Sequence, residues 1–185
     1  MHPNFVIREL YFQFFMRLTL DDAHLNTSQI DVHRKVVELA KYNNIKPIIE
    51  LTESVLSKLS VHHDKAAFNE THPKAIFASW FYVARFYNIY SELEVEKKND
   101  NNEKGRIDLL LTRRPPFEAD VPYQFIFELK YLKKATPNRL KEVKKEAVEQ
   151  LQEYLKDDKI KDLKDLIAYV VIFVGNKAEV VEVSQ

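Results

Sequence analysis

The sequence predicts an α/β fold, in which a mixed sheet is flanked by helices and preceded by a helical N-terminal extension. Up to about Leu59, apolar residues recur at helical spacing. After that point, short apolar stretches alternate as strands do, and one continuous apolar strand follows an amphipathic helix. The polar segment VHHDKAAFNETH (61–72) separates the two parts. We therefore expect an extension over residues 1–62 and a domain over residues 63–185.

The first part of the chain predicts three helices. The stretch from Phe5 to Leu20 is long, apolar and aromatic. The next stretch, 28–43, begins with Ser28, a residue type that caps helix N-termini. The stretch from Pro47 to Ser60 begins with a proline, which fits the first turn of a helix, and it carries one apolar stripe.

The second part predicts the order helix, strand, strand, strand, helix, strand, strand. Alternating residues such as Leu93 and Val95 indicate strands, the Asn-rich stretch NDNNEKG indicates a hairpin turn, and the run LIAYVVIFV indicates a fully buried strand. The expected elements are a helix over 73–88, strands over 90–98, 106–114 and 123–132, a helix over 137–158, and strands over 166–174 and 176–185.

Composition excludes several classes of function. The 185 residues carry no net charge, so no global field draws the protein to nucleic acid or to a membrane surface. Cysteine is absent, which excludes disulfides and cysteine-ligated zinc. Only two glycines occur, too few for a P-loop or a dinucleotide-binding fingerprint. No apolar run approaches the roughly 20 residues that cross a bilayer, so we expect a cytoplasmic protein without a membrane partner.

Charged residues interrupt two of the expected strands. Asp108 lies within GRIDLLL, and Glu128 and Lys130 lie within FIFELKYL. Residues i and i+2 of a strand share a face, so Glu128 and Lys130 point the same way, and a neighbouring strand would bring Asp108 to them. Two carboxylates suit Mg²⁺, which prefers hard oxygen ligands and keeps much of its water. Without a metal the acids would repel each other, and the lysine would offset part of their charge. The alternative is a purely structural ion-pair cluster.

The succession of GRIDLLL and FIFELK, followed by a helix with Gln and Tyr, resembles the PD-(D/E)XK nuclease superfamily. More narrowly, it resembles the bacterial branch in which such a domain follows a predicted AAA-type ATPase domain. The resemblance runs from about Phe68 to the end of the chain. It implies a restriction-endonuclease-like fold and cleavage of phosphodiester bonds in nucleic acid, with DNA expected, using Mg²⁺ or Mn²⁺. It also implies that the chain is a C-terminal piece of a larger protein, with the ATPase domain as a partner.

The resemblance also implies roles for individual residues. Asp108 and Glu128 correspond to the two acidic metal ligands of the family pattern, and the Leu129 carbonyl corresponds to a backbone ligand. Lys130 corresponds to the catalytic lysine, which would position the attacking water. Ile107 replaces the proline that gives the family its name.

Further polar residues are candidates for the same site. Gln150 and Tyr154 match a polar pair on the following helix, although their spacing is shorter than is usual in this branch. An upstream glutamate often completes the site, and Glu70 is our candidate with Glu92 as the competitor. The structural alternatives are a helix edge for Gln150, a core position for Tyr154, and a favourable helix N-terminal acid for Glu70.

A basic run follows the expected site, where a phosphate backbone would need counter-charge. Such a run is more often solvated surface, so both interpretations stay open. The alternative to an enzyme is a non-catalytic module that binds nucleic acid or a protein and serves the ATPase domain. The run consists of Lys133, Lys134, Arg139, Lys141, Lys144 and Lys145.

Overall fold

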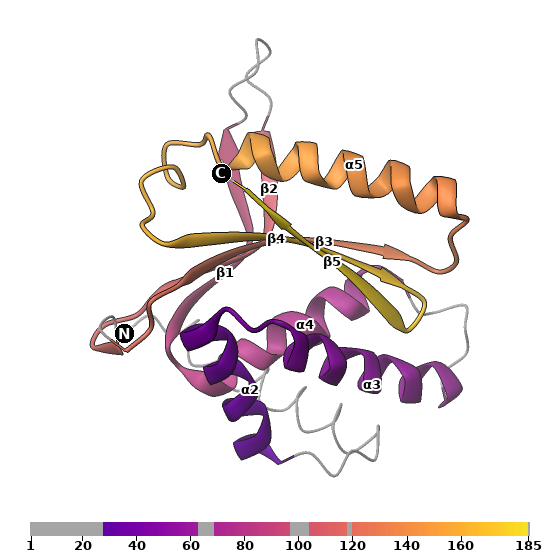
Figure 1. The fold of residues 1–185 in the computed structure, drawn as a ribbon, viewed down its shortest axis with the longest axis horizontal. Helices are drawn as coiled ribbons and strands as arrows, with labels where there is room; N and C mark the ends of the chain where they lie inside the picture. Colours follow the sequence, from indigo (N-terminus) through magenta and orange to yellow (C-terminus); the bar gives the residue numbers. More distant parts are fainter. Residues whose placement is uncertain (1–27, 63–68, 97–103, 118–119, 185) are drawn as a thin grey trace.

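The computed structural model describes residues 28–62, 69–96, 104–117 and 120–184 of the chain. A five-stranded sheet in the order β1-β2-β3-β4-β5 lies between two helical layers. Helix α5 covers one face, and α2, α3 and α4 cover the other (Figure 1). The elements are α2 (Gln29–Tyr42), α3 (Lys46–His62), α4 (Thr71–Ala84), β1 (Tyr87–Glu96), β2 (Lys104–Arg113), β3 (Gln124–Leu132), α5 (Pro137–Tyr154), β4 (Leu166–Val174) and β5 (Lys177–Val183).

The predicted fold class and the predicted order of elements within the described residues are confirmed. The helix expected at Phe5 to Leu20 lies outside the described residues, as does most of the turn expected at 99–105. The helix expected at 73–88 ends earlier, because Arg85 adopts a left-handed backbone conformation and Tyr87 already pairs in β1. The helix expected to reach residue 158 ends at Tyr154, where successive turns begin.

Local sequence explains where the helices begin. Ser28 and Asp31 form a capping box at the start of α2, in which each side chain accepts from the other residue's backbone N–H. Thr136 caps α5 by accepting from the Arg139 N–H, and Pro137 occupies the first turn, where its missing N–H has no effect on the helix.

Each face of the sheet has its own hydrophobic core. On the side of α2, α3 and α4, aromatic rings stack across the sheet, and the rings of Phe125, Phe127 and Tyr169 each stack on the other two. On the side of α5, Ile126 and Val170 pack against the apolar stripe of the helix, including Leu151. Strands β3 and β4 contribute residues to both cores. They pair in parallel, and α5 forms the crossover connection between them.

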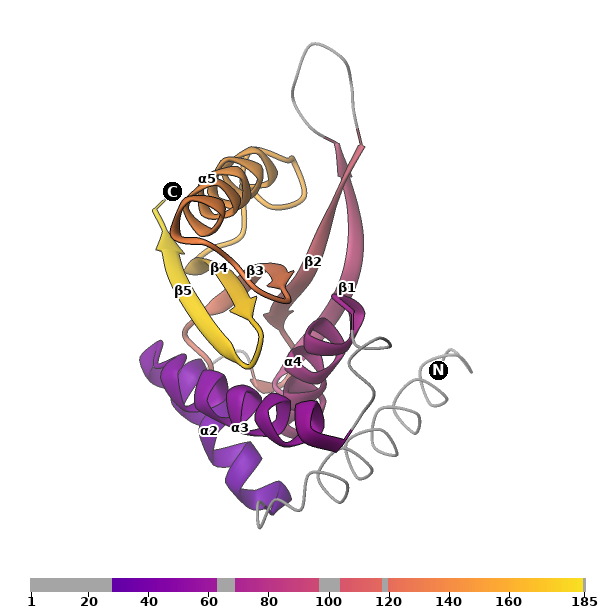
Figure 2. The ribbon, with the colours of Figure 1, turned by 90° about the vertical axis from the view of Figure 1, so that its right-hand side faces the viewer.

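The β1–β2 ribbon changes its orientation halfway along. All the recorded pairs of β1 and β2 share one register, but the pair that would join Glu92 to Asp108 is missing. Glu92 has a φ of 54°, in the left-handed region. On one side of this break Leu109 packs toward α4, and on the other side Ile107 packs toward α5. The ribbon then continues beyond the rest of the sheet on the side of α5 (Figure 2).

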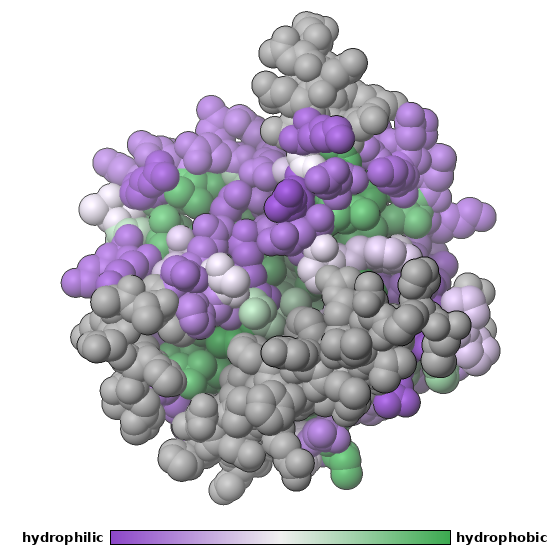
Figure 3. All heavy atoms as spheres, turned by 180° about the vertical axis from the view of Figure 1, so that it is seen from behind, coloured by the Kyte–Doolittle hydropathy of each residue, from purple (hydrophilic) through white to green (hydrophobic). Residues whose placement is uncertain are grey.

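The surface of the described part is mainly polar. Figure 3 shows hydrophilic residues over most of the coloured area of one face, with smaller apolar patches between them. None of the helices within the described ranges has the length and apolar character needed to cross a membrane.

Candidate functional site

Asp108 lies where β2 separates from β3. These strands pair only at Leu109–Phe127, Leu110–Ile126 and Leu111–Phe125. The next pair in that register would join Asp108 to Glu128, so the two acids occupy facing positions just beyond the last pair. The expectation that adjacent strands bring them together agrees with this geometry.

Both oxygens of Asp108 have partners. Its Oδ2 accepts from the Leu129 backbone N–H at 2.8 Å, so the carboxylate takes the place of a missing sheet hydrogen bond. Its Oδ1 accepts from Lys74 Nζ at 2.6 Å. The side chain of Asp108 is only 13% exposed. Asp108 is thereby held in one orientation between the two strands.

Glu128 is buried and incompletely satisfied. Its side chain is 2% exposed, and its Oε1 pairs with Lys130 Nζ at 2.6 Å. Its Oε2 has no hydrogen-bond partner among the residues that the structure describes. Burial, and after it the negative charge of Asp108, outweigh the opposing effect of Lys130 and raise the pKa of Glu128 to about 7. A buried carboxylate oxygen without a donor is costly unless a proton or a cation occupies it.

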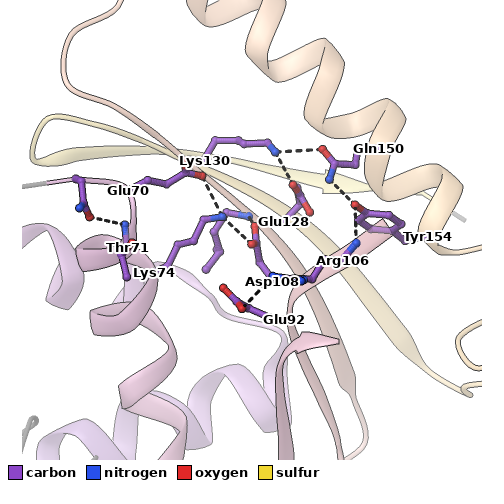
Figure 4. Close-up of polar contacts among 12 residues, drawn as sticks. Glu70, Thr71, Lys74, Glu92, Arg106, Asp108, Glu128, Lys130, Gln150 and Tyr154 are labelled. Atoms are coloured by element: carbon purple, nitrogen blue, oxygen red, sulfur yellow. Dashed lines mark hydrogen bonds and ion pairs between the residues drawn. The ribbon is translucent and has the colours of Figure 1, made fainter. Parts of the chain in front are cut away.

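Lys130 connects Glu128 to α5. Besides Glu128, its ammonium group donates to Gln150 Oε1 at 3.1 Å. The Gln150 amide donates in turn to the hydroxyl of Tyr154, which also accepts from the Arg106 backbone N–H at 3.3 Å. Figure 4 shows this chain of contacts running from β3 across to α5. Sequence reasoning expected Gln150 and Tyr154 near the site, and the contacts link both to Lys130.

Tyr154 has a mainly structural environment. Its ring belongs to the core on the side of α5 and is almost fully buried. Only its hydroxyl group takes part in the polar chain, and that group holds the backbone of β2 two residues before Asp108. Tyr154 therefore fixes the position of other residues and does not present its ring to a ligand.

Lys74 is a site residue that sequence reasoning missed. It lies in the first turn of α4 and pairs with both Asp108 and Glu70, with Nζ–O distances of 2.6 and 3.0 Å. Figure 4 shows it reaching from the start of α4 toward Asp108. The sequence held one signal, a glutamate four residues before a lysine at a helix start, which favours an ion pair between the two. The longer reach to Asp108 depends on tertiary structure.

The two upstream glutamates differ in their contacts. Glu70 reaches the site indirectly, through Lys74. Glu92 lies opposite Asp108 along the ribbon, but its carboxylate is 69% exposed and pairs with Arg106 at 3.4 Å. Of the two candidates, Glu70 is the one whose carboxylate contacts a residue bound to Asp108.

The cluster has more acidic than basic groups. Glu70, Asp108 and Glu128 supply three carboxylates, while Lys74 and Lys130 supply two ammonium groups. Fully ionised, it carries a net charge of −1. The described residues contain no group of three or more His, Cys, Asp or Glu side chains that could hold a metal ion. Any cation here would therefore rely on two carboxylates, backbone oxygen and water.

The basic run after β3 is mostly exposed. Arg139, Lys144 and Lys145 each pair with a carboxylate of this chain. For Lys134 and Lys141 the described residues record no ion pair, and both are exposed. These two lysines are thus the members of the run that are best placed to contact a ligand.

One of the comparisons with known proteins identifies a family. The sequence profile described as the PD-(D/E)XK nuclease superfamily matches residues 68–183, which include all the residues of the cluster. No curated protein matches the chain. The crystal structure of SSO0001 shares 15% sequence identity and a TM-score of 0.38, covering 94% of this chain and 76% of that chain. A likeness of that size supports no statement about function.

Proposed function

Because the chain belongs to the PD-(D/E)XK nuclease superfamily, we propose that it is a Mg²⁺-dependent nuclease that cleaves phosphodiester bonds of nucleic acid. The observation that supports this most is the unpartnered Oε2 of Glu128. That oxygen is buried, lies on the strand facing Asp108, and belongs to a carboxyl group whose pKa is raised to about 7 by burial and by Asp108. A divalent cation between the two acids would relieve both the desolvation and the repulsion.

The residues present fit such an ion. Asp108 and Glu128 offer hard oxygen ligands, the Leu129 carbonyl is our candidate for a backbone ligand, and water would complete the coordination. Mn²⁺ prefers the same ligand chemistry. When bound, the ion would polarise a phosphate oxygen and lower the pKa of a coordinated water.

Lys130 is our candidate for positioning the attacking water. An ammonium group has three N–H donors, and Glu128 and Gln150 account for two of those of Lys130. The third donor is available to a water or to a phosphate oxygen. Because Gln150 is itself held by Tyr154, the direction of the remaining donor is constrained. We therefore assign Gln150 and Tyr154 as residues that position Lys130.

The nucleic acid would approach over the basic run, and we expect it to be DNA. Lys134 and Lys141 are exposed and have no ion-pair partner within the described ranges. They support contact with phosphate, since neutralising phosphates releases bound counterions. The attached ATPase domain, the cytoplasmic location and the division at residue 62 stay predictions from the sequence.

A nuclease panel tests the proposal. Single- and double-stranded DNA and RNA would be incubated with the protein in Mg²⁺, Mn²⁺ or EDTA. We expect metal-dependent cleavage of at least one substrate. In parallel, Mn²⁺ would be titrated calorimetrically into the wild type, into Asp108→Ala and into a control, Lys177→Ala, which breaks an ion pair with Glu53 outside the site.

The two functional hypotheses give different results. A nuclease should bind the ion in the wild type and in the Lys177 variant but lose that binding in Asp108→Ala. Equal, negligible binding in all three proteins, together with no cleavage, would favour the non-catalytic binding module.

A further inference from the structure

We propose that the ammonium group of Lys74 takes the place of a metal ion at Asp108 in the metal-free protein. It must release the Asp108 carboxylate when a divalent ion binds. The inference rests on the proposed metal site. Asp108 Oδ2 already accepts from the Leu129 backbone N–H, so Oδ1 is the oxygen that we expect a cation to bind. Lys74 Nζ already binds Oδ1 at 2.6 Å. Lys74 and a metal ion therefore compete for one ligand atom.

The position of Lys74 is unusual for a lysine. It lies in the first turn of α4, where the helix dipole disfavours a positive charge. Its side chain is only 28% exposed. Burial lowers the pKa of Lys74, but the hydrogen bond and charge of Asp108, followed by those of Glu70, outweigh burial and raise that pKa. The two acids thus hold a charged ammonium group at a place that would otherwise disfavour it.

Glu70 gives Lys74 a second place to bind. The Glu70 carboxylate lies 3.0 Å from Lys74 Nζ and is half exposed, so it can keep the ammonium group when Asp108 turns to a metal ion. Displacement would then break one ion pair and retain the other. In this arrangement Glu70 acts through Lys74, as a positioning residue, and is not itself a metal ligand.

Removing Lys74 should strengthen metal binding. In Lys74→Met the competitor and its charge are lost while the apolar stem is kept. We expect Mn²⁺ affinity, measured by calorimetry, to rise by about tenfold, the scale of one charged hydrogen bond. Without metal, the melting temperature should fall, because Asp108 loses its counter-charge, and saturating Mn²⁺ should raise it by more than in the wild type. Lys177→Met should match the wild type in Mn²⁺ affinity.

A double-variant cycle tests the role of Glu70. Glu70→Gln in the wild-type background should weaken Mn²⁺ binding, because Lys74 loses its alternative partner and holds Asp108 more firmly. In the Lys74→Met background the same change should have no effect. A loss of affinity in both backgrounds would make Glu70 a direct ligand and would overturn its role through Lys74. Lys74→Gln gives the same comparison with Lys74→Met if the methionine variant does not fold.

Failure of this inference can be told apart from failure of the metal site. If Asp108→Asn weakens Mn²⁺ binding but neither Lys74 variant strengthens it, the competition by Lys74 is overturned and the metal site stands. If Asp108→Asn binds Mn²⁺ as the wild type does, no ion binds at Asp108, and both proposals are overturned.

Discussion

The two carboxylates that face each other at the end of the β2–β3 ladder have opposite environments. Asp108 has a partner on each oxygen, a backbone N–H on one and an ammonium group on the other. Glu128 is more deeply buried, yet no donor in the described ranges of the chain reaches one of its oxygens. Asp108 is thus oriented in advance, whereas Glu128 retains an unfilled acceptor. Within one cluster, therefore, one acid is held in a fixed orientation while the other keeps an oxygen to which nothing in the described part of the chain donates.

The pKa of Glu128 shows that the neighbouring Lys130 does not offset the effect of burial on this carboxyl group. Lys130 binds Glu128 at 2.6 Å and lowers the pKa of that carboxyl group. Burial and the charge of Asp108 act in the opposite direction and prevail, so the pKa of Glu128 rises to about 7. An ion pair at close range therefore does not make up for complete removal from water.

The largest expected effect comes from removing the cation next to Glu128. Lys130→Ala should reduce cleavage by roughly a hundredfold or more, the usual range for a group that positions or transfers a proton. The fold should persist, as judged by circular dichroism, because the lysine head group is partly exposed. Cleavage rates would be measured with saturating Mg²⁺. Lys177→Ala is the control, and full activity in Lys130→Ala would remove Lys130 from the mechanism.

The next effect concerns the stability of the metal-free protein. Glu128 has a folded-state pKa of about 7 against an ordinary value of 4.5. As pH rises between these values, the unfolded state ionises while the folded state keeps its proton, so the free energy of unfolding falls. Glu128→Gln, which resembles the protonated acid, should abolish this fall and be more stable at pH 8 by on the order of 3 kcal/mol.

Urea denaturation from pH 5 to pH 8 in EDTA would measure this difference. Glu53→Gln is the matched control, because both oxygens of Glu53 have partners, Lys177 Nζ and the Ala178 N–H. That variant should gain nothing at pH 8. Parallel curves for the wild type and Glu128→Gln would mean that Glu128 ionises normally in the folded protein.

The smallest expected effect comes from Tyr154 of α5, which holds Lys130 beside Glu128 through Gln150. Tyr154→Phe removes the acceptor of two donors, Gln150 Nε2 and the Arg106 N–H, and should cost about 1–3 kcal/mol of stability. Cleavage should fall a few-fold, since Gln150 then holds Lys130 less firmly. Tyr87→Phe loses a hydroxyl bonded to the Tyr123 carbonyl in the other core. Tyr87→Phe should lose stability at unchanged activity. If Tyr154→Phe also kept full activity, Tyr154 would have no role in positioning Lys130.

Periodicity predicted most of the fold because the elements carry their own signals. Strand β4 is a continuous apolar run and was expected at its observed bounds. Ser28 and Pro137 mark helix starts by their local chemistry. The sequence predicts that the fourth helix continues to residue 88, but α4 ends at Ala84. Arg85 adopts the left-handed conformation that ends the helix, and the sequence has no glycine there to indicate such an end.

The site was predictable only as far as strand geometry reaches. Alternation brought Glu128 and Lys130 together, and adjacency of the strands brought Asp108 near them. Lys74 was missed because its contact with Asp108 spans 34 residues and depends on how α4 packs. Alternation also fails across Asp108, since Ile107 and Leu109 serve different cores. That change coincides with the missing Glu92–Asp108 pair and with the left-handed φ of Glu92, which the residue types do not indicate.

The left-handed residue opposite Asp108 bears on how relatives of this protein could be found. Position 92 affects the neighbourhood of Asp108 through its left-handed φ. The Glu92 side chain itself points to solvent and pairs with Arg106 at the surface. Glycine and asparagine adopt that angle more readily than glutamate does. We therefore expect related proteins to keep this backbone bend while the residue type at the position varies. Comparison of structures should then detect a common ancestor more readily than comparison of sequences.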